Sequence, residues 1–151
     1  MKRLATAFLI GFAAIGTANA AEDEAVALAQ AFCGLAELDQ GMGRMYLLSS
    51  GLTEKVTAAL VAGGQGETAF GAGVPWASGD AAAGACSAGA VSAEDGVTLV
   101  DVIYGEGDAG WTDQLVLVAG EGGALVVDDI RYGKPGEAAT LGEAASALLT
   151  D

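Results

Sequence analysis

Three aspartates lie in apolar, β-branched stretches of this sequence and are its candidate catalytic groups: Asp101, Asp128 and Asp129. An ionised carboxylate is costly in such surroundings unless it is hydrogen-bonded or paired. A buried carboxylate with a raised pKa is, however, a suitable general base. Tyr104 and Tyr132 could supply phenol donors beside it. The catalytic set that these residues suggest is Asp101 or Asp129 acting with Tyr104.

The same acids also have a structural interpretation. Side chains alternate along a strand, so Asp128 and Asp129 are expected on opposite faces, and at most one of them points inward. The inward carboxylate could cap helix amides or pair with Arg131 or Lys134. We therefore expect these acids to be structural, and catalysis is the alternative.

Other reactive groups are scarce in this chain. Histidine is absent, so the usual base that activates a cysteine thiol is missing. Cys33 and Cys86 are far apart, which leaves no zinc or copper site. Glu106, Asp108 and Asp113 cluster around a turn but miss the EF-hand spacing, so we expect a solvated turn rather than a calcium site. The glycine-rich stretches lack the phosphate-loop pattern. We expect no metal and no cofactor.

Residues 1–20 have the pattern of a secretory signal peptide. Lys2 and Arg3 precede an uncharged, mostly apolar run, and a triplet of small residues ending at Ala20 fits signal peptidase. The apolar run is about twelve residues long, whereas a helix that spans a membrane needs roughly twenty. We expect the mature chain to begin near Ala21, in the periplasm of a Gram-negative bacterium or secreted from it.

Export changes the net charge of the mature chain and the expected oxidation state of its two cysteines. Removing residues 1–20 takes away two of six basic residues and none of the twenty acidic ones, which leaves a net charge of −16. Such acidity disfavours binding to nucleic acids and to anionic lipids. In an oxidising compartment an even pair predicts a disulfide, here Cys33–Cys86. Closing a loop of about fifty residues would be worth roughly 3–4 kcal/mol. Two separate buried thiols are the alternative.

Helical periodicity occurs in two stretches of the N-terminal half. The first starts at Asp23, which can cap a helix. Its apolar stripe is Leu28, Phe32 and Leu35. The second starts after Ser49-Ser50 and ends at Gly63. Its buried face is Leu52, Val56 and Leu60. Residues 63–85 are rich in glycine and alanine, and we expect a long loop anchored by Pro75-Trp76.

From Cys86 onward the pattern changes to the two-residue period of strands. The predicted strands are 97–104, 111–119 and 125–132, with a weaker one at 85–91. Short glycine-rich turns join them, which indicates an antiparallel meander. Thr140 and Glu143 form a capping box at the start of a closing helix. The order predicts one α+β domain over 21–151, with N-terminal helices packed on a curved, cone-like sheet of about four strands and a short C-terminal helix.

Several local sequences, taken with this order of elements, resemble the nuclear-transport-factor-2-like (cystatin-like) cone-fold superfamily, and within it small secreted bacterial proteins of unknown function. The resemblance covers about 25–151 and rests on LLSSGLTEKV at 47–56, Pro75-Trp76 followed by Ser78-Gly79-Asp80, and VVDDIRYG at 126–133. Ala124 stands where a tryptophan is often found. The resemblance implies that a tyrosine and an aspartate could lie in the cone, but this fold also hosts scaffolds without activity.

Two functions follow as expectations. The first is a non-catalytic exported domain that binds a partner protein or a small apolar ligand, with Trp76, Tyr104 and Trp111 lining the site. The second is a small enzyme of the isomerase or dehydratase type, which would use Asp101 or Asp129 with Tyr104. An enclosed cavity on which a carboxylate and a phenol converge would favour the enzyme.

Overall fold

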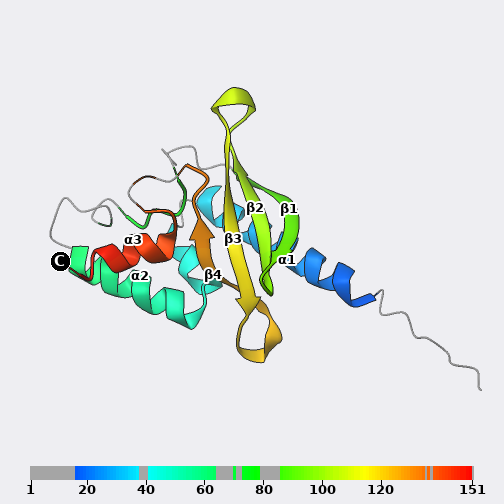
Figure 1. The fold of residues 1–151 in the computed structure, drawn as a ribbon, viewed down its shortest axis with the longest axis horizontal. Coiled ribbons are helices and arrows are strands. Elements are labelled where there is room, and N and C mark those ends of the chain that lie inside the picture. The colour runs from blue at the N-terminus through cyan, green and yellow to red at the C-terminus, as the bar shows by residue number, and fades with distance from the viewer. Residues whose placement is uncertain are drawn as a thin grey trace, which may run out of the picture.

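The protein is described by a computed structural model over residues 16–37, 41–63, 70, 73–78, 86–134, 136 and 138–150. As predicted, it is an α+β fold in which helices precede a four-stranded antiparallel sheet and a short helix ends the chain (Figure 1). The helices are α1 (Gly16–Glu37), the 3-10 helix η1 (Gly41–Leu47), α2 (Ser50–Gly63) and α3 (Leu141–Ala147). The strands are β1 (Cys86–Glu94), β2 (Val97–Tyr104), β3 (Trp111–Ala119) and β4 (Leu125–Arg131).

Helix α1 begins earlier than the sequence predicted. It starts at Gly16, and Asp23 lies inside it rather than at its N-cap. Alanines before Asp23, including Ala20 and Ala21, are strong helix formers and carry the helix toward the N-terminus. Most of the predicted signal peptide lies outside the described residues, so its cleavage stays a prediction. Within the described residues, no helix combines the length and apolarity needed to cross a membrane.

The sheet has the strand order β1-β2-β3-β4, and all neighbours are antiparallel. Asp95 and Gly96 close the first hairpin with φ angles of 51° and 85°. A type I′ turn requires positive φ at both central residues, and its twist matches that of the flanking strands. The meander predicted from the sequence is therefore formed by local hairpins.

Strand β4 departs from strict alternation. Val116 pairs with Asp129 and Leu117 pairs with Val127, so Asp128 is an extra residue at a β-bulge. The bulge lets Val127 and Ile130 both be fully buried, although they are an odd number of positions apart. Asp128 is exposed and Asp129 is half-buried. The simple alternation that we expected for these two acids is therefore interrupted by the bulge.

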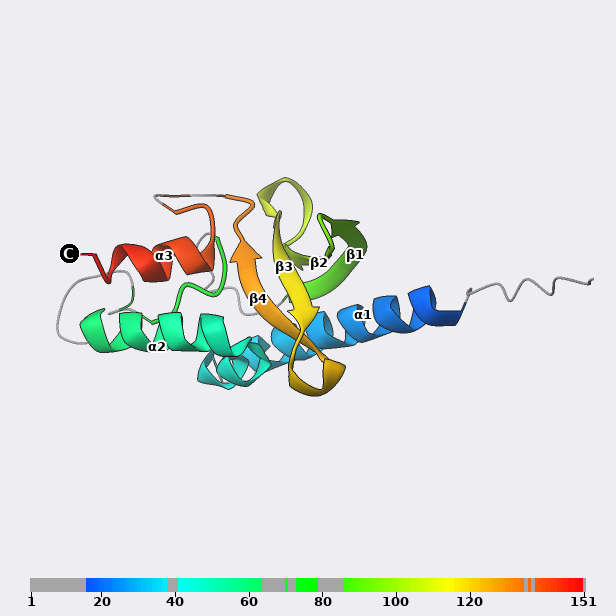
Figure 2. The same cartoon turned by 60° about the horizontal axis from the view of Figure 1, so that its bottom comes forward.

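One face of the sheet packs against α1, which runs beneath the strands in Figure 2. Ala25, Ala29, Phe32 and Cys33 form the buried stripe of this helix. The two alanines let the helix approach the sheet closely, and Phe32 fills the space beyond them. Val100, Val102, Leu115 and Leu117 complete the core from the sheet side.

The outer edge of β4 is covered by the segments that lead into α2 and α3. Ser49 N donates to Val127 O at 2.7 Å, and Tyr132 N donates to Ala139 O at 2.9 Å. These bonds hold both helices beside β4, where α2 and α3 pack together (Figure 1). Thr140 Oγ1 accepts from Glu143 N at 3.1 Å, and Glu143 Oε2 accepts from Ala139 N at 2.9 Å. The predicted cap of α3 is thus formed.

A disulfide joins α1 to the first strand. Cys33 and Cys86 are bonded, with their Cα atoms 5.2 Å apart. Cys33 is in the core, and Cys86 is the first residue of β1. The bond therefore fixes the helix to the free edge of the sheet, opposite the edge covered by α2 and α3.

Replacing both Cys33 and Cys86 with alanine should lower the free energy of unfolding by about 4 kcal/mol, because the bond closes a loop with a sequence separation of 53 residues. Urea unfolding of the purified mature chain measures this. Wild-type protein in a thiol reductant should lose a similar amount of unfolding free energy. Unchanged stability in both samples would contradict a structural role for the bond.

Candidate functional site

Asp113 on β3 is the only carboxylate with no exposed surface among the described residues. Its Oδ2 accepts a hydrogen bond from Ser78 N at 2.8 Å, and its Oδ1 accepts from Gly133 N at 2.8 Å. The Ser78 hydroxyl also donates to Oδ1. Ser78 Oγ in turn accepts from Lys134 N at 2.9 Å. The buried charge is therefore compensated by hydrogen bonds to its carboxylate.

This network, which we call the Asp113 clamp, joins three segments far apart in sequence. It consists of Asp113, Ser78, Gly133 and Lys134 and ties β3 to residues 73–78 and to the chain after β4. Gly133 can reach the carboxylate because it has no side chain. A Cβ there would lie 1.8 Å from Thr112 O. The clamp fixes residues 73–78 against the end of the sheet.

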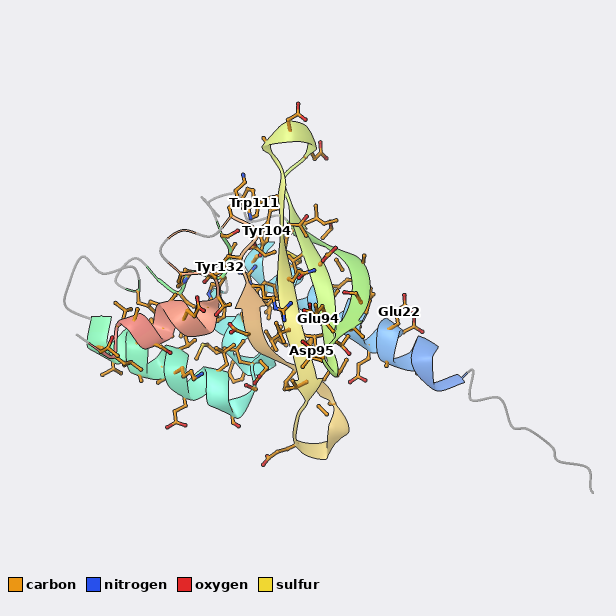
Figure 3. All side chains as sticks on the ribbon, in the orientation of Figure 1. Glu22, Glu94, Asp95, Tyr104, Trp111 and Tyr132 are labelled. Atoms are coloured by element: carbon orange, nitrogen blue, oxygen red, sulfur yellow. A yellow bond between two sulfur atoms is a disulfide. The ribbon has the colours of Figure 1, made fainter. Side chains whose placement is uncertain are left out.

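Three aromatic side chains, those of Tyr104, Trp111 and Tyr132, lie in the same region of the molecule (Figure 3). Tyr104 and Trp111 are paired across β2 and β3 and stack with centroids 5.1 Å apart and an interplanar angle of 12°. Lys134 Nζ lies 4.7 Å from the centroid of the Trp111 ring. Tyr132 donates its hydroxyl to Pro75 O at 2.6 Å, a second tie on residues 73–78.

Both tyrosines remain neutral phenols in this setting. Burial is the main cause that raises the pKa of Tyr104, with the Asp113 charge adding to it and the Arg44 charge opposing it. Burial also raises the pKa of Tyr132, and the charges of Asp113 and Asp129 contribute in the same direction. Tyr132 therefore remains a hydrogen-bond donor to Pro75 O near neutral pH, whereas the Tyr104 hydroxyl has no acceptor among the described residues.

Arg44 is the buried cation of the described chain, with 4% of its surface exposed. Its Nε donates to Phe32 O at 3.0 Å, and its guanidinium lies 4.1 Å from the Phe32 centroid and 5.9 Å from that of Trp76. Burial lowers the pKa of Arg44. The sequence analysis gave this residue no role, although its position in the apolar segment before Leu47 and Leu48 was a signal of burial.

A cleft of about 680 Å³ lies between residues 73–78 and α3. Its apolar wall consists of Pro75, Ala77, Ala144, Ala147 and Leu148. Tyr132 contributes a half-buried ring to the lining. Lys134 adds a positive charge to the same cleft, and Glu143 adds a negative one. The sequence predicted the closing helix and the Pro75-Trp76 anchor, but not that they face each other across a cleft.

The predicted catalytic residues are not brought together as a set. Asp101 lies on the face of β2 opposite Tyr104 and accepts from Gln114 Nε2 at 2.9 Å. Asp129 Oδ1 accepts from Ile130 N at 2.8 Å and from Gly142 N at 2.9 Å, in the first turn of α3. The second contact is the helix-amide role that the sequence offered as the structural alternative.

The predicted binding residues are placed in two groups. Tyr104 and Trp111 stack on one another, whereas Trp76 packs edge-to-face on Phe32 at 6.3 Å. The walls of the cleft are instead formed by the neighbours of these residues, among them Pro75, Ala77 and Lys134. Within the described residues, no three His, Cys, Asp or Glu side chains are grouped so that they could hold a metal ion.

Comparisons with known protein families, with curated protein sequences and with solved structures found no match for this chain.

Asp113→Asn should destabilise the protein by about 2–4 kcal/mol. The asparagine amide keeps one oxygen acceptor, but its NH₂ group places a donor against the backbone donor of Ser78 or of Gly133. Asp128→Asn is the matched control, since Asp128 is an exposed aspartate on β4 and should change stability by less than about 0.5 kcal/mol. Urea unfolding of both variants gives the comparison. Equal losses of unfolding free energy in the two variants would show that the Asp113 clamp does not stabilise the fold.

The raised pKa values of the two tyrosines predict alkaline destabilisation. Their pKa is about 10 in the unfolded chain and higher in the folded one, so the unfolded state loses protons first. The contribution of the two neutral phenols to the free energy of unfolding is fully present below about pH 10 and is lost as the pH rises above that value. Tyr132→Phe should reduce the slope of unfolding free energy against pH in this range. Tyr46→Phe, at a side chain 92% exposed, should leave the slope unchanged.

Proposed function

We propose that this protein is an exported, non-catalytic domain that binds a small apolar ligand in the cleft between residues 73–78 and α3. The cleft itself is the observation that carries the proposal. Its volume of about 680 Å³ lies within the range of small-molecule sites, roughly 300–1,000 Å³. Its lining is mainly apolar, with a few polar groups that could orient a ligand, which is the usual composition of such sites.

Both walls of the cleft are fixed before any ligand binds. The Asp113 clamp and the bond from Tyr132 to Pro75 hold residues 73–78. The cap formed by Thr140 and Glu143 holds the start of α3. A preformed site loses little conformational entropy when it binds, and this favours affinity for a ligand with few polar groups.

The bonding of the carboxylates supports binding over catalysis. Asp113, Asp101 and Asp129 all accept hydrogen bonds from backbone or amide donors. A general base must lie within reach of the substrate proton, and none of these three carboxylates lines the cleft. The isomerase- or dehydratase-type alternative would require Asp101 or Asp129 to leave its partner and approach Tyr104, and no contact favours that movement.

Export to the periplasm or beyond is part of the same proposal. It is supported by the N-terminal sequence pattern and by the Cys33–Cys86 disulfide, a bond that persists in oxidising compartments. A partner protein was the other expectation from the sequence. The ligand-sized volume of the cleft favours a small molecule instead.

Titration with the neutral fluorescent probe N-phenyl-1-naphthylamine tests the site. The mature wild-type protein should bind it with a saturable rise in fluorescence. Ala147→Trp should weaken binding about tenfold or more, because the indole would occupy the cleft from an exposed position on α3.

Val61→Trp is the matched control, since Val61 is 79% exposed on α2 and does not line the cleft. This variant should bind the probe as the wild type does. Equal affinity of both tryptophan variants, or no saturable binding by the wild type, would contradict the proposal.

A further inference from the structure

The polar side chains that line the cleft differ in whether the chain itself already uses them. They are Ser78, Tyr132, Lys134 and Glu143. The Ser78 hydroxyl donates to the Asp113 carboxylate, and the Tyr132 hydroxyl donates to Pro75 O at 2.6 Å. A hydroxyl has a single hydrogen to donate, so neither side chain has a donor left for a ligand.

The carboxylate of Glu143 is also engaged. Its Oε2 accepts a hydrogen bond from Ala139 N at 2.9 Å, as part of the cap of α3. Glu143 lies in the first turn of this helix, where backbone amides stabilise a negative charge. The negative charge that lines the cleft is therefore partly compensated within the chain.

Lys134 is the remaining polar side chain of the lining. Its backbone N donates to Ser78 Oγ at 2.9 Å, and its Nζ lies 4.7 Å from the centroid of the Trp111 ring. The one ion pair among the described residues joins Arg131 to Glu94, so the Lys134 ammonium has no carboxylate partner there. Contact with a ring face uses no lone-pair acceptor, so the N–H groups of this ammonium can still bind a ligand.

The charge of the whole chain limits what this lysine can attract. Residues 21–151 contain four basic and twenty acidic residues, a net charge of −16. One ammonium can balance one negative charge, whereas a dianion would bring a second charge into these acidic surroundings. A cationic ligand would be repelled by Lys134 itself. The rest of the lining is mainly apolar, so the cleft favours an apolar group with one negative charge at its end.

We propose that the cleft binds an amphipathic monoanion, of which a medium-chain fatty acid is the simplest example. This inference rests on the proposed function, because it names the class of ligand for the same cleft. The alkyl chain lies against Ala77, Ala144 and Leu148, and the carboxylate pairs with Lys134 Nζ. Charge-assisted hydrogen bonds are stronger than neutral ones, so the carboxylate should raise the affinity of the alkyl chain about tenfold.

Displacement of N-phenyl-1-naphthylamine from the mature wild-type protein tests the headgroup separately from the cleft. The competitors are octanoate, octanol and octylammonium, which share one alkyl chain and differ in charge. All are used below their micellar concentrations and at constant ionic strength. Octanoate should bind about tenfold more tightly than octanol, and octylammonium should bind no more tightly than octanol.

Substitutions of Lys134 assign this preference to one side chain. Lys134→Met removes the charge but keeps an apolar stem over Trp111 and the backbone bond to Ser78, so the preference for octanoate over octanol should be lost in a folded protein. Lys134→Arg keeps the charge and should keep the preference. Lys55→Met is the matched control, since Lys55 is exposed on α2 and does not line the cleft, and it should bind octanoate as the wild type does.

Failure of this inference can be distinguished from failure of the proposed function. The inference is overturned if the wild type binds octanol as tightly as octanoate, or if Lys134→Met and Lys55→Met show the same preference, while the proposed apolar site would stand. Tighter binding of octylammonium than of octanol would also overturn it, because the acidic surroundings would then decide the preference. A wild-type protein that binds neither the probe nor any of the competitors contradicts the proposed function and the inference together.

Discussion

The buried carboxylate of Asp113 is the interaction on which the rest of this structure depends. It lies on the core side of β3 without exposed surface, and only hydrogen bonds from Ser78 and Gly133 make that burial tolerable. Those donors come from segments that lie outside the sheet. The same bonds that satisfy the charge therefore place residues 73–78 and the chain after β4, and these two segments with α3 define the cleft.

This arrangement links stability to function. Hydrophobic packing of α1 on the sheet and the Cys33–Cys86 bond fix one side of the molecule. On the other side the clamp and the cap of α3 fix the walls of an apolar cleft. The acids that the sequence offered as bases, Asp101 and Asp129, accept hydrogen bonds from Gln114 and Gly142, and the proposed function of the cleft is therefore binding.

Periodicity predicted the α+β class and the strands, because these depend on local pattern, and the even pair of cysteines in an exported chain predicted the disulfide. Alternation along the strand 111–119 puts Asp113 on the same face as Leu115 and Leu117, so the prediction that this acid belongs to a solvated turn was wrong, and Asp113 is buried. Its partners could not be predicted, since Ser78 is remote in sequence and meets Asp113 only in the folded chain. The bulge at Asp128 was missed for a similar reason: it is set by pairing with β3 rather than by local sequence.

Amide hydrogen exchange of Ser78 and Gly133 tests the central claim most directly. Each of these backbone amides donates to the Asp113 carboxylate, so it can exchange only when that bond opens. The account predicts that both amides exchange at least about a thousandfold more slowly than an unstructured peptide and open together. Exchange of either amide at the rate of an unstructured peptide would contradict it, because residues 73–78 would then not be held by Asp113 and the cleft would have no fixed wall.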